Sequence, residues 1–255
     1  MITSTTNGTV KHILALQKKH SLRSEEGVFI VEGLRMFREI PAERIVCAFV
    51  TEEAYKTPEV YNCLKGVRSE LVSEQVMKAM SETVTSQGMM AVVKQLDCRI
   101  VPKKGRTYLL LDRLSDPGNL GTIIRMAEAS DVAGVILSSD CVDIYNPKVV
   151  RSTMGAILRV PFEYVESLTD YIEKLKSAGI KVYGASLENS TDYAKLDYTD
   201  GCAFVIGNEA NGMSGAVSAA CSENIHIPMT GSVESLNASI AASVLAFEAY
   251  RQRRL

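Results

Sequence analysis

Apolar runs alternate with amphipathic stretches along the first hundred residues. The runs at 28–31, 45–50 and 89–93 are short and rich in Val, Ile and Met, which predicts buried strands. The stretch 73–80 has apolar residues at helical spacing, and Ser73 stands in the N-cap position before them. We therefore expect a small α/β domain at this end of the chain.

In the second part of the chain the alternation becomes stricter. Residues 108–111 form a continuous apolar run, which is typical of a strand buried on both faces of a parallel sheet. Further strands are predicted at 134–137, 180–185, 203–206 and 225–227, and helices at 119–130, 147–154, 168–178, 213–220 and 235–251. The last helix carries Leu236, Ile240, Val244 and Phe247 on one side. Alternating strands and helices predict a mostly parallel sheet with helices on both faces.

The fold class is thus α/β, with two domains. A polar stretch that holds Pro102 and Gly105 between basic residues marks the boundary. We expect a domain over 1–98 with a basic N-terminal arm, a linker over 99–106, and a parallel-sheet domain over 107–255.

The composition restricts the class of protein. Of the 255 residues, 46% are hydrophobic, and no run approaches the roughly 20 apolar residues of a membrane helix. The N-terminus lacks the apolar segment of a signal peptide. Six cysteines lie far apart without a C-x-x-C pair, which argues against a disulfide framework and favours a cytoplasmic protein. With only three histidines, no metal site is predicted.

Charge is unevenly distributed, although the net charge is only −2. Residues 1–106 hold 16 Lys and Arg against 12 Asp and Glu, whereas residues 107–255 hold 12 against 18. The first 24 residues carry four basic side chains and no acidic one. This distribution favours a polyanionic partner for the first domain, and it fits a solvated surface with a loose terminus equally well.

Three polar loops follow predicted strands of the second domain, where α/β sheets usually bind ligands. The first leads into a helix that begins near Asn119 and carries Arg125. Packing alone would make Asn119 an N-cap and would place Arg125 in a salt bridge. The second loop holds Gly207 and Glu209, which would otherwise turn the chain and favour a helix N-terminus.

The third loop, residues 227–239, is the most informative. It runs from a short apolar strand into a long Ala-rich helix. A helix start needs one capping oxygen, yet this loop supplies Thr230, Ser232, Ser235, Asn237 and Ser239. Clustered backbone donors and small side chains at a helix N-terminus suit a polar ligand that comes close.

Common nucleotide and hydrolase signatures are missing from the chain. There is no G-x-x-x-x-G-K-[ST] phosphate loop and no G-x-G-x-x-G, which disfavours an ordinary dinucleotide-binding domain. Neither H-E-x-x-H nor G-x-S-x-G occurs, which weakens a hydrolase interpretation.

Taken together, the three loops resemble the SpoU family of RNA ribose 2′-O-methyltransferases, within the SPOUT superfamily. The motifs are N-x-G-x-x-x-R at 119–125, I-G-N-E-x-x-G-M at 206–213 and I-P-M-x-G-x-x-x-S-L-N-x-S at 227–239. The catalytic-domain resemblance covers about residues 107–253. The segment F-I-V-E-G-x-R at 29–35 is similar to the family's substrate-binding domain, which has a ribosomal-protein-like α/β fold.

The resemblance implies a deep trefoil knot in the C-terminal domain, formed by threading the segment near 203–250 through an earlier loop. It also implies a homodimer with active sites near the interface, and S-adenosyl-L-methionine bound bent in the knot. The cofactor-binding residues would be Ala185, Ser186, Gly207, Ile227, Met229 and Leu236. Met229 and the loop 185–187 would enclose the adenine, and small residues at Gly207 and Gly231 would let loops approach the ligand.

By the same resemblance the catalytic residues would be Asn119, Arg125, Glu209, Ser235 and Asn237. Arg125 would stabilise the alkoxide that develops as a ribose 2′-hydroxyl attacks the methyl group, because a guanidinium with a pKa above about 12 is a poor base. Asn119 would orient Arg125 or the ribose, and Glu209 would hold Arg125 or a neighbouring arginine. Ser235 and Asn237 would shape the pocket, and a phosphate or water would take the proton.

The leading hypothesis is an RNA 2′-O-methyltransferase that acts on 23S ribosomal RNA, since tRNA-specific relatives often lack so large an N-terminal domain. The alternatives are a tRNA 2′-O-methyltransferase, a non-catalytic RNA-binding or ribosome-assembly module on the same fold, and a nucleotide-binding enzyme of another type. The need for a 2′-hydroxyl excludes DNA as substrate. RNA and a second copy of the chain are the expected partners, with no membrane and no metal.

Overall fold

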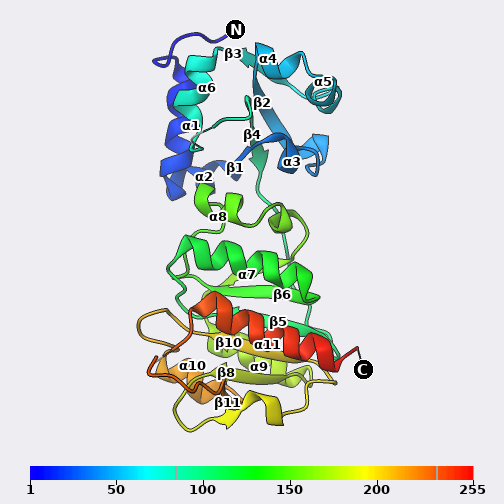
Figure 1. Ribbon diagram of the computed structural model, residues 1–255, viewed down its shortest axis with the longest axis vertical. Coiled ribbons are helices and arrows are strands. Elements are labelled where there is room, and N and C mark those ends of the chain that lie inside the picture. The colour runs from blue at the N-terminus through cyan, green and yellow to red at the C-terminus, as the bar shows by residue number, and fades with distance from the viewer. Residues whose placement is uncertain (84, 234, 255) are drawn as a thin grey trace. The chain divides into compact units, whose positions relative to one another are not determined.

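The computed structural model describes every residue of the chain except Val84, Glu234 and Leu255. Contacts divide the chain into two compact units, each built from two stretches of sequence. Unit 1 is Met1–Asp97 with Asp143–Leu158, and unit 2 is Cys98–Val142 with Arg159–Leu255 (Figure 1). Within the described part of the chain, no helix has the length and apolar character needed to cross a bilayer.

Unit 1 contains a four-stranded mixed sheet in the order β1-β4-β2-β3. Strand β4 is antiparallel to both β1 and β2, whereas β3 is parallel to β2. The strands are β1 (Val28–Glu32), β2 (Ile45–Thr51), β3 (Ser69–Val72) and β4 (Met89–Lys94). The helices are α1 (Gly8–Lys18), α2 (His20–Glu26), α3 (Leu34–Phe37), η1 (Ala42–Arg44), α4 (Glu52–Tyr55), α5 (Pro58–Cys63), α6 (Glu74–Met80), α8 (Pro147–Ser152) and η2 (Ala156–Leu158).

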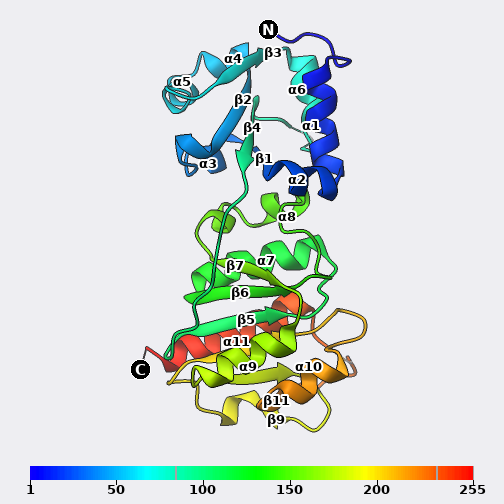
Figure 2. The ribbon, with the colours of Figure 1, turned by 180° about the vertical axis from the view of Figure 1, so that it is seen from behind.

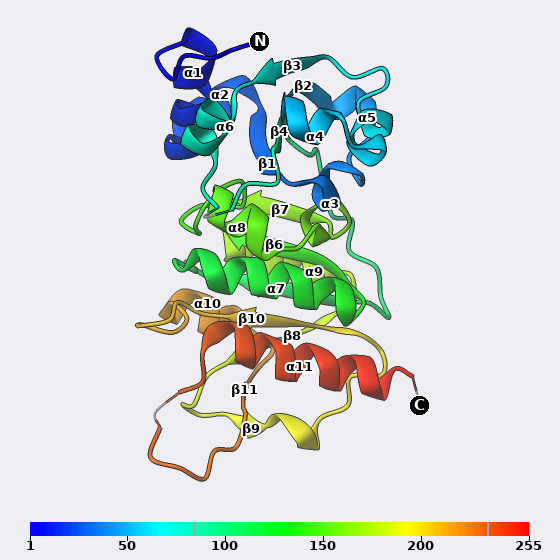
Figure 3. The same ribbon diagram turned by 45° about the horizontal axis from the view of Figure 1, so that its top comes forward.

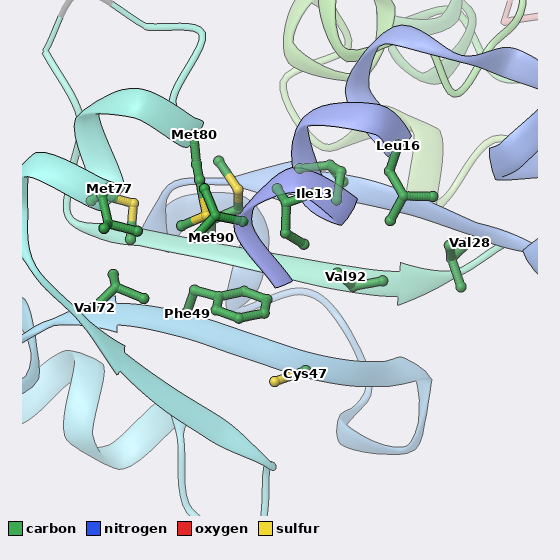
Figure 4. Packing of buried hydrophobic residues seen from close by; sticks show 13 residues of the cluster. Ile13, Leu16, Val28, Cys47, Phe49, Val72, Met77, Met80, Met90 and Val92 are labelled. Carbon is green, nitrogen blue, oxygen red and sulfur yellow. The ribbon is translucent and has the colours of Figure 1, made fainter. Parts of the chain in front are cut away.

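Helices α1 and α6 cover one face of this sheet. Figure 4 shows Met77 and Met80 of α6 and Ile13 of α1 meeting Phe49 and Met90 of the strands, and all five side chains are buried. Methionine is unbranched and flexible, so it fills the irregular space between helix and sheet. Helix α6 begins as the sequence predicts, because the hydroxyl of its N-cap serine accepts a hydrogen bond from the backbone N–H three residues later.

The N-terminal residues form packed helices rather than an extended arm. Helix α1 buries Val10, Ile13 and Leu16, whose three-residue spacing puts them on one face. In α2, Arg23 is only 2% exposed, and its guanidinium donates to the Leu16 carbonyl and pairs with the carboxylate of Asp143. The charge of Arg23 is therefore neutralised inside unit 1.

The basic excess that the sequence assigns to the first domain does not lie in unit 1. Over residues 1–106 the excess of basic over acidic residues is four, and it equals the four residues Arg99, Lys103, Lys104 and Arg106. All four belong to unit 2. Any attraction of unit 1 for a polyanion therefore depends on where its charges lie rather than on their sum.

The segment 143–158 joins unit 1, although the sequence places it between strands of the second domain. Its Tyr145 ring lies 4.8 Å from the ring of Phe29, and its hydroxyl accepts a hydrogen bond of 2.7 Å from the backbone N–H of Leu96. Helix α8 packs against β1. Aromatic contact, hydrogen bond and the Arg23–Asp143 pair together hold this segment in place.

Unit 2 contains a seven-stranded sheet in the order β7-β6-β5-β10-β8-β11-β9, and every pairing in it is parallel. The strands are β5 (Thr107–Leu111), β6 (Val132–Ser138), β7 (Phe162–Val165), β8 (Lys181–Ala185), β9 (Thr191–Asp192), β10 (Cys202–Ile206) and β11 (Glu223–His226). The helices are α7 (Pro117–Ala129), α9 (Leu168–Ser177), η3 (Tyr193–Lys195), α10 (Gly215–Ala220) and α11 (Ala238–Gln252). The predicted α/β class and parallel sheet are confirmed.

Helices cover both faces of this sheet, as the alternating pattern predicts. Helices α7 and α11 lie side by side over one face (Figure 1), and α9 and α10 lie over the other (Figure 2). The central strands β5 and β10 are buried along their whole length, which explains their continuous apolar sequence. The knotted path predicted for the segment near 203–250 stays a prediction.

The apolar row on α11 is not the face that this helix buries. Ala242, Leu245 and Ala246 are buried, whereas Ile240 is 52% and Phe247 is 44% exposed. Small alanines let α11 come close to α7, so the buried face needs few large side chains. The exposed row leaves an apolar surface on unit 2.

Candidate active site

The loops that follow β5, β8, β10 and β11 meet at one edge of the parallel sheet, because the carboxyl ends of parallel strands share an edge. Figure 3 shows the long connection from β11 to α11 on this side of unit 2. The three loops that the sequence singles out are therefore brought together, as their motifs require.

Asn119 lies at the centre of a side-chain network. Its Nδ2 donates to Oε1 of Glu209 over 2.9 Å, and its Oδ1 accepts from Nδ2 of Asn237, also over 2.9 Å. Asn119 is only 8% exposed. It does not cap its helix, because α7 begins two residues earlier and Asp116 is the N-cap. The side-chain amide of Asn119 is thus fixed by partners from two other loops.

Glu209 is held from several directions at once. Besides Asn119, the backbone N–H groups of Ser115 and Asp116 and the hydroxyl of Ser115 donate to its two oxygens. Partial burial by itself raises the pKa of Glu209, but these hydrogen bonds outweigh it and lower the pKa below its ordinary value. The carboxylate is therefore charged at neutral pH.

Asn237 has two structural roles. Its Oδ1 accepts hydrogen bonds from the backbone N–H groups of Ser239 and Ile240, so it is the N-cap of α11. Its Nδ2 remains free to donate to Asn119. The N-cap therefore couples the start of the last helix to the start of α7.

Arg125 stands apart from this network. It lies six residues after Asn119 in α7, which is about 9 Å along the helix axis and on a different face. Its side chain is exposed, and among the residues that the structure describes it has no hydrogen bond or ion pair. In the structure Glu209 binds Asn119, Ser115 and Asp116 rather than Arg125. The other alternative, that Glu209 holds a neighbouring arginine, stays a prediction.

Gly207 is required by the backbone of its own loop, and its approach to a ligand stays a prediction. A Cβ at this position would lie 2.2 Å from both the carbonyl carbon of Gly212 and the nitrogen of Met213. The loop thus folds back on itself, and a bridge between Asn208 and Gly212 closes it. Gly207 permits close approach of the chain to itself. At Gly231 a built Cβ would meet no described atom nearer than the Val233 nitrogen, at 4.0 Å, and the approach of this loop to a ligand stays a prediction.

Sequence reasoning missed two polar residues that shape these loops. Asp112, which is only 3% exposed, accepts a hydrogen bond of 2.6 Å from the backbone N–H of Ser214. Asn208 donates from Nδ2 to the carbonyl of Arg113, 2.8 Å away. The signal for Asp112 was available, because an acidic residue directly after a fully buried strand is rarely left without a partner.

A cavity of about 450 Å³ lies beside the network, within the range of about 300–1,000 Å³ for small-molecule sites. Five of the six predicted cofactor-binding residues line it: Ala185, Ser186, Ile227, Met229 and Leu236. Ser235 also lines it, two residues before Asn237, whereas Gly207 is not among the described residues that do. Apolar side chains such as Leu187 and Leu245 complete the wall. A cavity lined by apolar side chains together with polar ones such as Glu188 and Asn211 fits S-adenosylmethionine, which joins a flat adenine to a charged amino-acid tail.

Fold and site together define an α/β protein with a small-molecule site at the carboxyl ends of its strands. The family model for the SpoU rRNA Methylase family matches residues 106–247. A second model, the MRM3-like substrate binding domain, matches residues 7–91.

Similar proteins match over nearly the whole chain. The 23S rRNA (guanosine(2553)-2′-O)-methyltransferase RlmP of Bacillus subtilis is 31% identical, over 96% of this chain and 97% of that protein. The uncharacterized tRNA/rRNA methyltransferase slr1673 of Synechocystis is 34% identical, over 99% of this chain and 94% of that protein. The structure of an AdoMet-bound rRNA methyltransferase from Sinorhizobium meliloti has a TM-score of 0.88 at 31% identity, covering 98% and 97% of the two chains.

A second solved structure that contains AdoMet is also similar to this chain over nearly its whole length. The SpoU methyltransferase AviRb of Streptomyces viridochromogenes, in complex with AdoMet, has a TM-score of 0.86 at 28% identity, covering 97% of this chain and 99% of that one. The chain therefore belongs to the SpoU methyltransferase family. The predicted family, the enzyme class and the cofactor S-adenosylmethionine are confirmed.

Proposed function

We propose that this protein transfers a methyl group from S-adenosylmethionine to a ribose 2′-hydroxyl of 23S ribosomal RNA. One observation carries the proposal: Ser235 and Leu236, which directly precede Asn237 of the Glu209–Asn119–Asn237 network, line a cavity of cofactor size. The similarity to a Bacillus protein named for 23S rRNA 2′-O-methylation, over nearly all of both chains, supports the choice of RNA.

The cavity residues would hold the cofactor mainly by shape. All four residues Leu187, Ile227, Met229 and Leu236 line the cavity. Leu187 and Met229 would enclose the adenine, and the backbone groups of Ile227 and Leu236 would meet its polar edge. When bound, S-adenosylmethionine supplies a methyl group on a positively charged sulfur. The chain's own part is to align the attacking oxygen and to exclude water, and alignment alone lowers such barriers greatly.

The network and Arg125 would have separate roles in the reaction. Asn119, fixed by Glu209 and Asn237, offers a rigid polar edge to the ribose. Arg125 is exposed and has no partner in the described part of the chain, so it is free to stabilise the developing alkoxide or an adjacent phosphate. Ser235 lines the cavity next to the network and would contact the substrate.

A homodimer is the proposed functional form. Ile240 and Phe247 form an exposed apolar row along α11, and such rows on a water-exposed helix mark contact surfaces. This helix starts at Asn237, so a partner seated on it would lie near the reaction site. The six cysteines are free thiols, which supports the proposed cytoplasmic location.

The test is transfer of a labelled methyl group from S-adenosylmethionine to total RNA of a bacterium that lacks this protein, followed by mapping of the labelled nucleotide. We expect a single alkali-resistant 2′-O-methyl nucleotide in 23S rRNA. If the label were confined to tRNA, the substrate would be tRNA rather than ribosomal RNA. Absence of label from every RNA, with tight binding of S-adenosylmethionine in calorimetry, would overturn the proposed catalysis and favour an RNA-binding module.

A further inference from the structure

Unit 1 has a cavity of its own, of about 230 Å³, that no step of the proposed reaction uses. Its walls come from β1, α3, the segment before β4 and helix α8. Residues 143–158 therefore complete it, although they are more than 50 residues away in sequence from the other walls. The cavity is smaller than sites of about 300–1,000 Å³ that take drug-sized molecules, so it suits a single ring system.

The inner part of this cavity is apolar. Ile30 of β1 is 4% exposed, Met36 of α3 is 7% exposed and Val150 of α8 is 2% exposed. Met154 closes the outer side and is 40% exposed. Flexible, polarisable methionine side chains on two sides form a surface against which a flat ring packs well.

Two arginines stand at the rim. Arg35 of α3 is exposed, and within the described residues it has no hydrogen bond or ion pair. Arg151 of α8 lies 3.7 Å from the carboxylate of Glu82, and the two side chains are 47% and 39% exposed. An exposed pair at this distance contributes little, so Arg151 can exchange Glu82 for another anion. Both guanidinium groups are therefore available to phosphates.

A carboxylate lies at the polar end of the same cavity. Oε1 of Glu32 accepts a hydrogen bond of 2.7 Å from the hydroxyl of Thr83 and a second one from the hydroxyl of Ser81. Its other oxygen, Oε2, has no partner among the described residues. The two hydroxyls fix the orientation of Glu32, and a fixed, unpaired carboxylate oxygen is a strong acceptor for an N–H group.

An unpaired RNA nucleotide satisfies all three features. Its base is flat and apolar on both faces, its edge carries N–H donors, and its phosphates are anionic; proteins read RNA mainly through such unstacked bases. A phosphate group alone does not fit, because Glu32 and Glu82 would repel it. We propose that this cavity takes one unstacked base of the substrate RNA, with its N–H edge on Glu32 and its flanking phosphates on Arg35 and Arg151. The identity of the RNA bound at this site rests on the proposed function.

The test measures the Kd of the full-length protein for transcribed 23S rRNA by filter binding, separately from methyl transfer. We expect Arg35→Glu and Arg151→Glu each to raise Kd about tenfold, since each loses a phosphate contact and gains repulsion. Lys148→Glu is the matched control: Lys148 is exposed on the same helix as Arg151 but does not line the cavity. It should change Kd less than twofold.

The sign of the effect at Glu32 separates base recognition from phosphate binding. Glu32→Gln keeps an acceptor for Thr83 and Ser81 but removes the charge, so we expect Kd to rise several-fold if a base N–H is bound. Glu82→Gln, which removes a rim charge of the same sign, should leave Kd unchanged or lower it. A lower Kd for Glu32→Gln, or arginine variants equal to Lys148→Glu, would overturn the proposal. Methyl transfer by the wild-type protein decides the proposed function independently.

Discussion

The side-chain amide of Asn237 donates a hydrogen bond to the side-chain oxygen of Asn119 over 2.9 Å, although 118 positions separate the two residues. Asn119 in turn donates to Glu209. Three loops are thereby locked to one another by side chains that all belong to the family motifs. The consequences of this network, and of Arg125, which has no partner among the described residues, are open to direct test.

Substitution can separate the two roles of Asn237, which are to cap α11 and to donate a hydrogen bond to Asn119. Asn237→Asp keeps an oxygen for the backbone N–H groups at the start of α11 but cannot donate to Asn119. We expect a large loss of methyl transfer while the cap of α11 is kept. Asn237→Ala should lose activity too, and should be about 1 kcal/mol less stable than Asn237→Asp, because it also lacks the N-cap. Ser167→Ala, which removes the cap of α9, should lose stability alone in urea unfolding. Full activity of Asn237→Asp would contradict this role.

Arg125 should matter for catalysis without mattering for the fold. Because it is exposed and has no partner in the part of the chain that the structure describes, Arg125→Ala should leave the melting temperature and S-adenosylmethionine binding unchanged. Methyl transfer should fall by about 100-fold or more, as when a stabilising donor at a developing oxyanion is removed. Turnover at saturating RNA measures the loss of methyl transfer, and calorimetry measures whether binding of the cofactor is unchanged. Wild-type turnover in Arg125→Ala would rule out the proposed role.

Gly207 should tolerate no side chain. A Cβ there would lie 2.2 Å from backbone atoms of Gly212 and Met213, which cannot move as a flexible side chain does. Gly207→Ala should therefore lower the unfolding free energy by about 1–3 kcal/mol or more. Gly215→Ala is the control, because Gly215 opens α10 with nothing within 4 Å of its Cβ position. Equal stability of the two variants would show that the loop can relax around the added methyl group.

Glu209 gives the stability of unit 2 a defined dependence on pH. Its pKa in the folded protein is lower than its ordinary value, so its contribution is fully present above the unfolded value of about 4.3 and is lost as pH falls through the folded value. The stability difference between wild type and Glu209→Gln should thus be constant near neutral pH and shrink only in acid. Chemical unfolding across that range measures it. A difference that shrank already between about pH 7 and about pH 6 would contradict a lowered pKa.

The exposed row on α11 should control assembly. Ile240→Asp combined with Phe247→Asp places two charges on the proposed contact surface, so we expect the protein to sediment as a monomer with its fold intact. Val101→Asp is the control, because Val101 is 72% exposed but lies outside this row. Light scattering after gel filtration distinguishes the species. A double variant that remains dimeric would place the interface elsewhere.

Local pattern determined most of the secondary structure. Continuous apolar runs located β5 and β10, and Ser73 located the start of α6, because these signals are carried by neighbouring residues. Sequence reasoning missed the short strands β3, β7 and β9 and the helices α1, α2, α4 and α5. Most of these are too short to carry a periodic pattern, whereas α1 has one that went unread. The loops that carry the site were also readable, since their motifs are short and continuous.

Only the tertiary structure decided which residues far apart in the sequence contact one another. The sequence named Asn119, Glu209 and Asn237 but offered Arg125 or a neighbouring arginine as the partner of Glu209, because spacing along a chain does not reveal which side chains meet after folding. It could not show that 143–158 belongs to unit 1, where Asp143 pairs with Arg23. Composition and local periodicity fix which segments become strands and helices. Hydrogen bonds and burial across 90 to 120 positions fix which of their side chains form a site.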